Sequence, residues 1–598
     1  MESRRSKRFI KLHLVCFIGV ILIPCAAIGA KINVPSKEYP TIQDGIDAAS
    51  EGDTVLVADG LYTGKGNKML EFNGKAITVR SANGPENCII DCEGFGSGFY
   101  FWDGEDENSV VSGFTIIRGN GAGIFCSSAS PTISNCIIRD TISEYGGGIK
   151  CEESSPKITN CIITGGERSG IYCKSSSSPT ISDCVITGNK GSGIECLSSS
   201  SPTIANCVIK NNTAMYGGGI SCSEGSPTIS NSVISENTAT VSGGGVRFFY
   251  CTSPIIIGCT ISSNTGGGAG GIDSYHSSPI IRDCVINDNK VSGGAGGVGF
   301  HMSSATVTNC VISSNEAQDC AGLIAVGSAT NIVNCTIRNN RASARGGGIC
   351  ANGSVTATNS ILWGNTPDEI LTGLGGSMNA TYCDIESGFT GEGNIDANPL
   401  FFTLSDHHLS SVSPCLDAGI SEGAPDRDID GDPRPQGSGY DIGADEYTYG
   451  CVLPVPDIRG TYSGSYTIEV SNCDDSSSDG MYTFSVIINI TTQTECAFSG
   501  LAVGTIMFEG SPVSENIILN GIITKAGRIS GNTSHTFLGT AGEGVFVGQL
   551  SGNGLTVSNI GQDTSGETCT YTRSIFAIRE AKVTPKAMPW IPLLLDDR

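Results

Sequence analysis

Apolar and polar residues alternate in short runs that recur about ten times between residues 121 and 360. The clearest copies read Gly-Ile-x-Cys, then Ser-Pro-Thr-Ile-Ser-Asn-Cys-x-Ile, then a polar turn ending in Gly-Gly-Gly. Alternation with a period of two places Ile124 and Cys126 on one face of a strand and Phe125 on the other. Each copy therefore predicts three short strands whose Ile and Cys side chains point inward.

The cysteine of the second phrase marks each copy, and the spacing of these markers indicates the architecture. Successive markers lie 23 to 27 residues apart. A period in the twenties is typical of a solenoid, in which every copy forms one turn. Parallel stacking would place equivalent residues about 4.8 Å apart, one above another. The markers are Cys136, Cys161, Cys184, Cys207, Cys259, Cys284, Cys310 and Cys335, with Ser232 and Ser360 in the same column.

The cysteines form a second column in the first phrase, and the chain has 26 of them in all. A disulfide framework is the first alternative to consider. Inward neighbours on adjacent strands would hold their Cβ atoms about 4.8 Å apart, outside the range of about 3.5–4.5 Å that a disulfide requires. A zinc array is disfavoured because the columns contain Ile and no Cys-x-x-Cys occurs. We therefore interpret the columns as small buried hydrophobic residues. The second column is Cys126, Cys151, Cys173, Cys196 and Cys222.

The residue before the marker is usually asparagine, and twice aspartate. Stacked amides can bond to the backbone and to the equivalent amide of the next turn. This column therefore predicts a structural ladder at a turn. Its members are Asn135, Asn160, Asp183, Asn206, Asn231, Asp283, Asn309, Asn334 and Asn359.

The first 120 residues predict an export signal and a cap. Residues 1–30 place basic, apolar and small residues in the order of a secretory signal peptide, too short for a lasting membrane span. We expect a secreted or cell-surface protein without a transmembrane segment after cleavage. Thr41 can cap a helix that covers the open end of the solenoid, so residues 31–120 form the cap and first turns and residues 121–394 the regular repeats.

Residues 39–62 carry a resemblance to a known family. Tyr-Pro-Thr-Ile-Gln-x-x-Ile-x-Ala-Ala, Gly-Asp-Thr-Val and Asp-Gly-x-Tyr resemble the N-terminal cap of pectate-lyase-like right-handed β-helix proteins. The resemblance, over about residues 32–447, implies an all-β, right-handed, single-stranded parallel β-helix with turns of about 25 residues. It implies no single activity, because the superfamily includes lyases, hydrolases, esterases and epimerases. The polygalacturonase motif set is absent, and no calcium-binding aspartate cluster with an arginine base can be assigned.

After residue 394 the pattern changes. Residues 395–450 contain Asp-Gly-Asp-Pro-Arg-Pro and Asp-Ile-Gly-Ala-Asp-Glu, which resemble the C-terminal closure of exported bacterial β-helix proteins. Acidic residues at alternate positions resemble the first half of a calcium loop, although Gly437 stands where an EF-hand has Glu. Calcium binding and a capping turn with Arg434 paired to acids both remain open. The four acidic residues are Asp426, Asp428, Asp430 and Asp432.

The C-terminal part predicts a second domain. Residues 451–456 form a linker, and residues 457–580 alternate without the repeat period, which indicates a small antiparallel β-barrel or sandwich. Residues 581–598 form a tail that docks on this domain or serves as a sorting tag. Four cysteines outside the columns are the best disulfide candidates, in one of three pairings. They are Cys451, Cys473, Cys496 and Cys569.

Charge restricts the partners. The net charge is −24, and it becomes −28 without residues 1–30, which contribute +4. Such acidity disfavours nucleic acids and anionic membranes. We expect a monomer that contacts a polysaccharide or surface glycan.

The outward positions of the first-phrase strands hold the candidate chemistry. Aromatic faces can stack on sugar rings, and a basic residue beside an acid can remove the proton next to a uronic carboxylate. The alternative is that outward positions vary freely without function. The catalytic candidates are Lys150, Glu195, Arg247, Asp273, His276 and His301, and the substrate-binding candidates are Phe125, Tyr172, Tyr250, Tyr275 and Phe300.

Three functions are compatible with this pattern. Regular turns and the missing family motifs favour a non-catalytic exported protein that binds glycans. A polysaccharide lyase or glycoside hydrolase acting on acidic polysaccharide is the second hypothesis. A surface adhesin or structural protein is the third.

Overall fold

The computed structural model describes residues 29–447, except 143–145, 374, 402–406 and 411, and the backbone of eight strands between residues 460 and 579. Several sequence predictions lie outside the described residues. These are the signal peptide up to residue 28, the linker 451–456, the tail 581–598, and Cys451, Cys473, Cys496 and Cys569.

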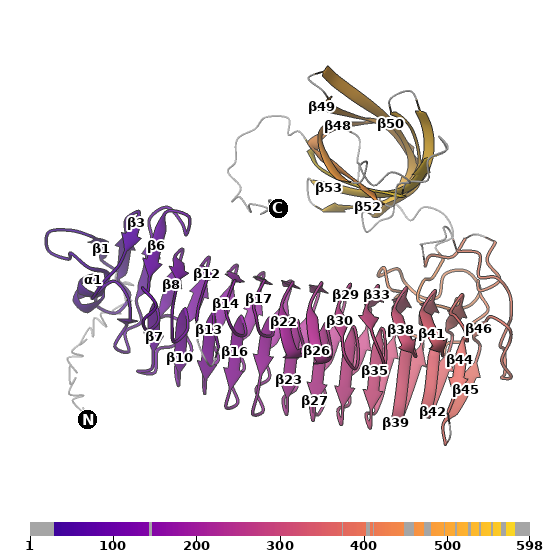
Figure 1. Cartoon of the computed structure of the whole chain (residues 1–598), viewed down its shortest axis with the longest axis horizontal. Helices are drawn as coiled ribbons and strands as arrows, with labels where there is room; N and C mark the ends of the chain where they lie inside the picture. Colours follow the sequence, from indigo (N-terminus) through magenta and orange to yellow (C-terminus); the bar gives the residue numbers. More distant parts are fainter. Residues whose placement is uncertain are drawn as a thin grey trace, which may run out of the picture.

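The repeats wind into a right-handed parallel β-solenoid, as the sequence predicted, and it has about 14 turns (Figure 1). Each turn contributes short strands that pair in register with their equivalents in the next turn. Ile124, Phe125 and Cys126, for example, lie beside Ile149, Lys150 and Cys151. The strands stack into columns, which we call faces 1 to 4.

Face 1 is formed by the Gly-Ile-x-Cys strands, and its outward side carries the candidate residues. Its strands are β4 (Leu70–Glu71), β7 (Phe99–Phe101), β10 (Ile124–Ser127), β13 (Ile149–Glu152), β16 (Ile171–Lys174), β19 (Ile194–Cys196), β23 (Ile220–Ser223), β27 (Val246–Phe249), β31 (Ile272–Tyr275), β35 (Val298–His301), β39 (Leu323–Val333), β42 (Ile349–Thr358) and β44 (Ile370–Thr372).

Face 2 follows face 1 in each turn, and β39 and β42 are long enough to belong to both. Its other strands are β1 (Lys31–Val34), β2 (Thr54–Val57), β5 (Thr78–Ser81), β8 (Val110–Ser112), β11 (Thr132–Ser134), β14 (Lys157–Thr159), β17 (Thr180–Ser182), β20 (Thr203–Ala205), β24 (Thr228–Ser230), β28 (Ile255–Ile257), β32 (Ile280–Arg282), β36 (Ala305–Thr308) and β45 (Ser377–Thr381).

Face 3 contains the strand that follows the marker cysteine. Its strands are β3 (Gly60–Tyr62), β6 (Cys88–Asp91), β9 (Thr115–Ile117), β12 (Ile137–Arg139), β15 (Ile162–Thr164), β18 (Val185–Thr187), β21 (Val208–Lys210), β25 (Val233–Ser235), β29 (Thr260–Ser262), β33 (Val285–Asn287), β37 (Val311–Ser313), β40 (Thr336–Arg338), β43 (Ile361–Trp363) and β46 (Asp384–Ile385).

Face 4 is shorter and lies in the later turns, just before the Gly-Gly-Gly segment. Its strands are β22 (Thr213–Tyr216), β26 (Thr238–Ser242), β30 (Thr265–Gly266), β34 (Lys290–Val291), β38 (Glu316–Asp319) and β41 (Arg341–Arg345). This extra strand brings side chains to the edge of face 1 that the three-strand interpretation of the repeat did not foresee.

Helix α1 (Ile42–Ala48) covers the N-terminal end of the solenoid. Thr41 is its N-cap, as expected from the sequence, and Asp44 completes a capping box. Ile42 and Ile46 are fully buried. The helix therefore shields the apolar cross-section that the first turn would otherwise expose.

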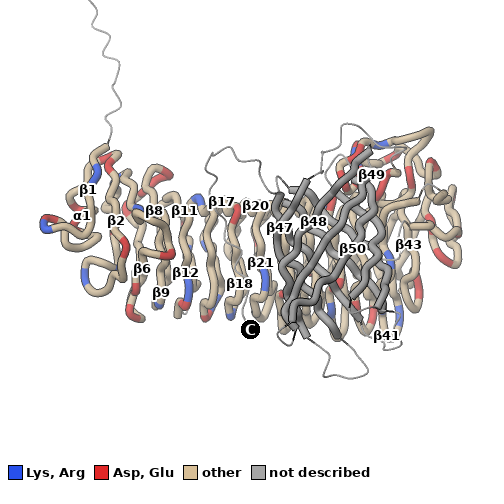
Figure 2. The backbone as a smooth tube through the Cα atoms, turned by 90° about the horizontal axis from the view of Figure 1, so that it is seen from above, with Lys and Arg blue, Asp and Glu red and all other residues tan. Residues whose placement is uncertain are grey.

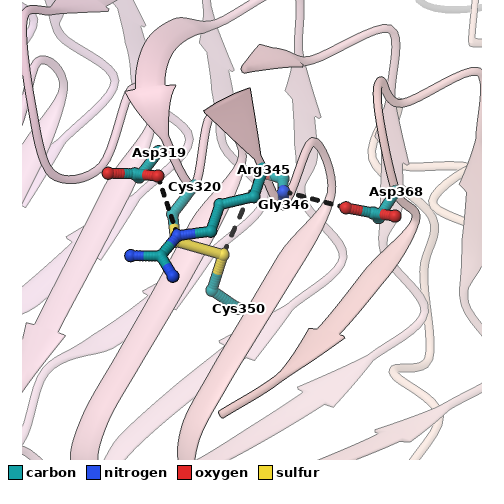
Figure 3. Close-up of a disulfide and its surroundings, with 6 residues drawn as sticks. All are labelled: Asp319, Cys320, Arg345, Gly346, Cys350 and Asp368. Atoms are coloured by element: carbon teal, nitrogen blue, oxygen red, sulfur yellow. Dashed lines mark hydrogen bonds and ion pairs between the residues drawn. A yellow bond between two sulfur atoms is a disulfide. The ribbon is translucent and has the colours of Figure 1, made fainter. Parts of the chain in front are cut away.

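The core is a continuous stack of Ile, Val, Phe and Cys. Every cysteine of the two predicted columns is buried and free, which confirms their packing role. The sequence analysis missed one disulfide, between Cys320 and Cys350, because neither residue belongs to those columns. Figure 3 shows this disulfide with Arg345, whose Nε donates to Asp319 Oδ1 at 2.9 Å.

The predicted asparagine column adopts the left-handed backbone conformation, with φ of 47–57°. A second asparagine column, five residues after each marker from Cys184 to Ser360, forms the continuous buried ladder. From Asn212 on, the Oδ1 atom of each member accepts the backbone N–H and the side-chain N–H of the asparagine one turn earlier, at 2.8–3.1 Å. The members are Asn189, Asn212, Asn237, Asn264, Asn289, Asn315, Asn340 and Asn365.

Residues 407–447 form a closure that packs back along the last turns. The side chains of Asn309, Asn334 and Asn359 donate to the backbone carbonyls of Arg427, Asp441 and Ile420, respectively. Arg434 forms a fully buried ion pair with Glu446 at 2.8 Å. The predicted capping turn with Arg434 paired to an acid is therefore present.

The C-terminal strands form a closed antiparallel barrel, one of the two predicted forms. The strands are β47 (Gly460–Ser471), β48 (Gly480–Thr494), β49 (Ala497–Phe508), β50 (Ser511–Ile523), β51 (Arg528–Phe537), β52 (Thr540–Ser551), β53 (Gly554–Asp563) and β54 (Thr570–Arg579). Pairing of β47 with β54 closes it. Across the part of the chain that the structure describes, no helix has the length and apolarity needed to cross a membrane.

Candidate functional site

The predicted outward column exists as one row of stacked positions on face 1. In-register pairing joins its members from turn to turn. Acidic and basic residues are spread along the whole solenoid in Figure 2, so charge alone does not single out a site. The row is Phe125, Lys150, Tyr172, Glu195, Ser221, Arg247, Asp273 and Gly299.

Six of the predicted residues and three residues in contact with them gather at the later turns, where face 4 meets face 1. We call this group the Arg247 cluster. Gly243, between β26 and β27, has φ of 68° and an added Cβ would lie 2.7 Å from the Val246 carbonyl oxygen, so only glycine suits this corner. The cluster comprises Tyr216, Ser242, Arg247, Phe249, Tyr250, Asp273, Tyr275, His276 and His301.

Arg247 lies between two aromatic rings. Its Cζ is 4.2 Å from the ring centroid of Tyr216 and 4.5 Å from that of Phe249, within the range of cation–π contact. Burial lowers the pKa of its guanidinium group, and Asp273 opposes this shift. Its Nε is buried without a hydrogen-bond partner. A ligand oxygen that reached this donor would satisfy a buried polar group.

Asp273 is the buried acid of the cluster, with 6% of its surface exposed. Ser242 Oγ donates a hydrogen bond to Asp273 Oδ2, and His301 Nε2 lies 3.6 Å from Asp273 Oδ1. Desolvation raises the pKa of Asp273, while Ser242, His301 and Arg247 oppose the rise. A carboxyl group of raised pKa beside an imidazole has the elements of acid–base chemistry.

Aromatic rings form the exposed rim of the cluster. Phe249 and Tyr275 stack with centroids 5.5 Å apart and planes 17° apart, and Tyr250 stacks on His276 at 4.9 Å and 9°. Tyr250 exposes 50% of its surface, and His276 is also exposed. Arg247, Asp273, His276, His301, Tyr250 and Tyr275, all predicted from the sequence, therefore share one surface region.

A second group lies at the early turns of face 1. Lys150 Nζ is 5.0 Å from the ring centroid of Phe125 and 3.0 Å from Glu152 Oε1. Tyr100 contacts both Phe125 and Trp102, with centroids 5.9 and 5.1 Å apart, and Trp102 is 46% exposed. Phe125 and Lys150 were predicted. Tyr100 and Trp102 were not, because they precede the regular copies, although the aromatic run at residues 99–102 was a visible signal.

Two predicted residues lie between these groups. Tyr172 exposes only 8% of its surface, so it offers little area for stacking on a sugar. Glu195 Oε2 accepts a hydrogen bond from Ser169 Oγ at 2.6 Å.

The assignment of Phe300 to the outward side was wrong. Phe300 is fully buried and pairs in register with Ser274 and Ala325 on the inward side of face 1. Its position continues the inward cysteine column through Phe248. The period of two already placed it inward, because Gly299 and His301 are the outward neighbours.

Only two of the four predicted acidic residues, Asp426, Asp428, Asp430 and Asp432, lie close to each other as metal ligands would. Asp428 and Asp430 have ligand-type atoms within 4.8 Å of each other and of Asp445. Asp426 is exposed, and neither it nor Asp432 belongs to a described cluster of three ligand atoms. Desolvation raises the pKa of Asp428 and of Asp445 to about 6. The four-aspartate arrangement expected of a calcium loop is not formed, and calcium binding itself stays a prediction.

Residues 42–168, 140–240 and 169–337 match the family model described as "Right handed beta helix region". The repeat region is a right-handed β-helix. No curated protein matches the chain.

Several solved structures resemble this β-helix chain. A PL6 family alginate lyase, AlyGC, aligns at 14% identity and a TM-score of 0.32, covering 59% of this chain and 53% of that one. The chain thus spans about half the length of the lyase. Tailspike protein 2 of bacteriophage CBA120 aligns at 12% identity and a TM-score of 0.25, covering 93% of this chain and 77% of that one. A capsular polysaccharide depolymerase of Acinetobacter baumannii bacteriophage Fri1 aligns at 13% identity and a TM-score of 0.20, covering 92% of this chain and 84% of that one.

Proposed function

We propose that this β-helix protein is exported and binds a polysaccharide through the outward side of face 1, with the Arg247 cluster as the main contact. The observation that carries the proposal is the combination of two ring pairs, the exposed pair Tyr250–His276 and the partly buried pair Phe249–Tyr275, beside a half-buried guanidinium group. Aromatic faces pair with the apolar faces of sugars, and Arg247 can donate to hydroxyl or carboxylate oxygens.

The expected contribution of Tyr250 can be estimated from its exposure. An aromatic side chain buries about 150–250 Å² when fully covered. Covering the exposed half would remove about 75–125 Å² from water, or at most about 2–3 kcal/mol. Part of this is offset by ordering and by the hydroxyl group, so truncation should weaken binding by about tenfold.

The test is a binding series with a panel of neutral and acidic polysaccharides, by affinity electrophoresis and calorimetry. Tyr250→Ala and Tyr275→Ala should each weaken binding of the recognised glycan. Leu61→Ala, which truncates a side chain 63% exposed on face 3, is the matched control and should have no effect. Absence of binding to every glycan, or equal binding by all variants, would contradict the proposal.

Salt dependence adds a second readout. The net charge of the chain is −24, so long-range repulsion opposes a polyanionic glycan and is screened at higher ionic strength. Binding of an acidic polysaccharide should therefore strengthen with salt at low ionic strength, whereas binding of a neutral one should not change. This comparison separates the two substrate classes.

Cleavage of the bound glycan is a second candidate, favoured by the contact of Asp273 with Ser242 and its proximity to His301. Asp273 would exchange a proton with the sugar, and His301 would hold or relay it. A lyase would release unsaturated uronates, detected by ultraviolet absorbance, and a hydrolase would release reducing ends. Product from native protein that disappears in Asp273→Asn and in His301→Gln would establish activity; its absence across the panel would leave a binding protein.

A further inference from the structure

Two consecutive histidines of the closure meet one carboxylate, in a place separate from face 1. One ligand-type atom from each of His407, His408 and Asp430 lies within 4.8 Å of the others. His408 Nε2 is 2.6 Å from Asp430 Oδ2, and the two imidazole rings stack with centroids 4.3 Å apart. Side chains of consecutive residues in an extended chain point to opposite sides, so their convergence requires a specific local backbone.

Two further carboxylates border the same aspartate. Asp428, Asp430 and Asp445 form a second group of ligand-type atoms within 4.8 Å, and it shares Asp430 with the histidine group. Backbone N–H groups hold both neighbours. Asp428 Oδ1 accepts from Asp430 N and Asp432 N, Asp428 Oδ2 accepts from Glu446 N at 3.1 Å, and Asp445 Oδ2 accepts from Leu409 N at 2.7 Å. These bonds leave carboxylate lone pairs for another partner.

We propose that His407, His408 and Asp430 bind a divalent transition-metal ion of the zinc class, with Asp428 or Asp445 completing the coordination. Imidazole nitrogen and carboxylate oxygen bind Zn²⁺ at about 2.0–2.2 Å, usually four ligands in a tetrahedron. Calcium prefers six to eight oxygen ligands, so two histidines argue against it. On binding, the His408–Asp430 hydrogen bond opens and both groups turn to the ion. Each histidine coordinates as a neutral imidazole, so a proton on the coordinating nitrogen moves through solvent to the other ring nitrogen.

The ion would join three segments of the closure that are distant in sequence, residues 407–408, 428–430 and 445. The closure in turn bonds to Asn309, Asn334 and Asn359 of the last turns. The site therefore has a structural role: it fastens the closure over the solenoid, and metal binding should stabilise the folded chain by linkage.

The experiment uses the full chain, without a histidine tag and freed of metal by dialysis against a chelator. Zn²⁺ is titrated by competition with a chromophoric chelator and by calorimetry, with Ca²⁺ and Mg²⁺ in parallel. We expect one equivalent of zinc, a higher unfolding temperature with zinc, and weaker responses to calcium and magnesium. His407→Gln should reduce the zinc affinity at least tenfold. The double variant His276→Gln/His301→Gln, which changes the two histidines of face 1, should bind zinc as the native chain does.

His407→Gln leaves the His408–Asp430 hydrogen bond in place, so its metal-free unfolding temperature shows whether it folds normally. The native chain gives an independent readout, since zinc should protect His407 and His408 from diethyl pyrocarbonate, measured by peptide mass mapping. The proposal is overturned if native protein binds no stoichiometric zinc or if zinc protects neither histidine. It is also overturned if a folded His407→Gln binds zinc equally, or if calcium binds more tightly than zinc.

Discussion

Replacing Asn264 with Leu measures what the buried asparagine ladder contributes to stability. The Asn264 side chain donates to the Ile234 carbonyl at 2.8 Å and to Asn289 Oδ1 at 3.0 Å. Its Oδ1 accepts the backbone and side-chain N–H groups of Asn237, both at 3.0 Å. Leu has the same number of side-chain heavy atoms and the same branching at Cγ, so the change removes the hydrogen bonds while it keeps the shape of the side chain.

The magnitude follows from the groups that lose a partner. Without the amide, the Ile234 carbonyl loses one donor, and two N–H groups of Asn237 lose their acceptor. Asn237 and Ile234 are both fully buried. A buried polar group left without a partner costs about 1–3 kcal/mol, so three such groups predict a loss of about 3–9 kcal/mol of folding free energy.

The assay is urea unfolding followed by circular dichroism, with hydrogen exchange to locate the loss. Amides of β25 and β33, one turn before and one turn after the substituted position, should exchange faster. Asn206→Gly is the control: Asn206 is exposed, its φ is 54°, and its side chain makes a 3.3 Å bond to Asp183. Glycine suits that backbone, so the cost should stay below about 0.5 kcal/mol. Equal losses in the two variants would refute the ladder as a source of stability.

Three further outcomes are expected. Burial raises the pKa of Glu369 to about 8 from 4.5, so the folded state retains a proton that the unfolded chain releases. The free energy of unfolding should therefore fall as pH rises from 4.5 to 8. In Glu369→Gln the midpoint of urea unfolding should depend less on pH over this range, and an unchanged pH dependence would contradict the prediction. Cys320→Ser/Cys350→Ser should lose at most about 3–4 kcal/mol, because the disulfide closes a loop with a sequence separation of 30; unchanged thermal unfolding would contradict this. Thiol titration in denaturant should detect at least the 18 free cysteines of the described residues, and fewer than five would contradict the packed columns.

The repeat allowed most of the solenoid to be predicted because its signals are local. Alternation with a period of two along each strand assigned the Ile and Cys positions to the core, and a repeat period of about 20 to 30 residues identified the turns of the solenoid. The same alternation placed Phe300 inward. The prediction that Phe300 points outward was wrong because it was grouped with the neighbouring aromatic residues. The buried asparagines, Asn189 to Asn365, also recur periodically in the sequence. Their burial and their hydrogen bonds distinguish them from the predicted column, Asn135 to Asn359, but these differences are visible only in the structure.

Other features depend on contacts between residues far apart in the chain. Tyr216 and Ser242 join the Arg247 cluster from face 4, a strand with no apolar period strong enough to predict it. The bond from Arg434 to Asn309 spans 125 residues, and the convergence of His407 with Asp430 depends on the closure path. Sequence patterns within single turns contain no information about such pairs.

The in-register stacking of turns has an evolutionary consequence. A duplication or deletion of one whole unit, 23 to 27 residues, would preserve every column and change the distance between surface groups by about 4.8 Å. The group at Phe125 and the one at Phe249 lie on strands β10 and β27, so the number of intervening units sets their separation. Such a chain can be matched to ligands of different length by recombination at the level of the gene, without redesign of the core.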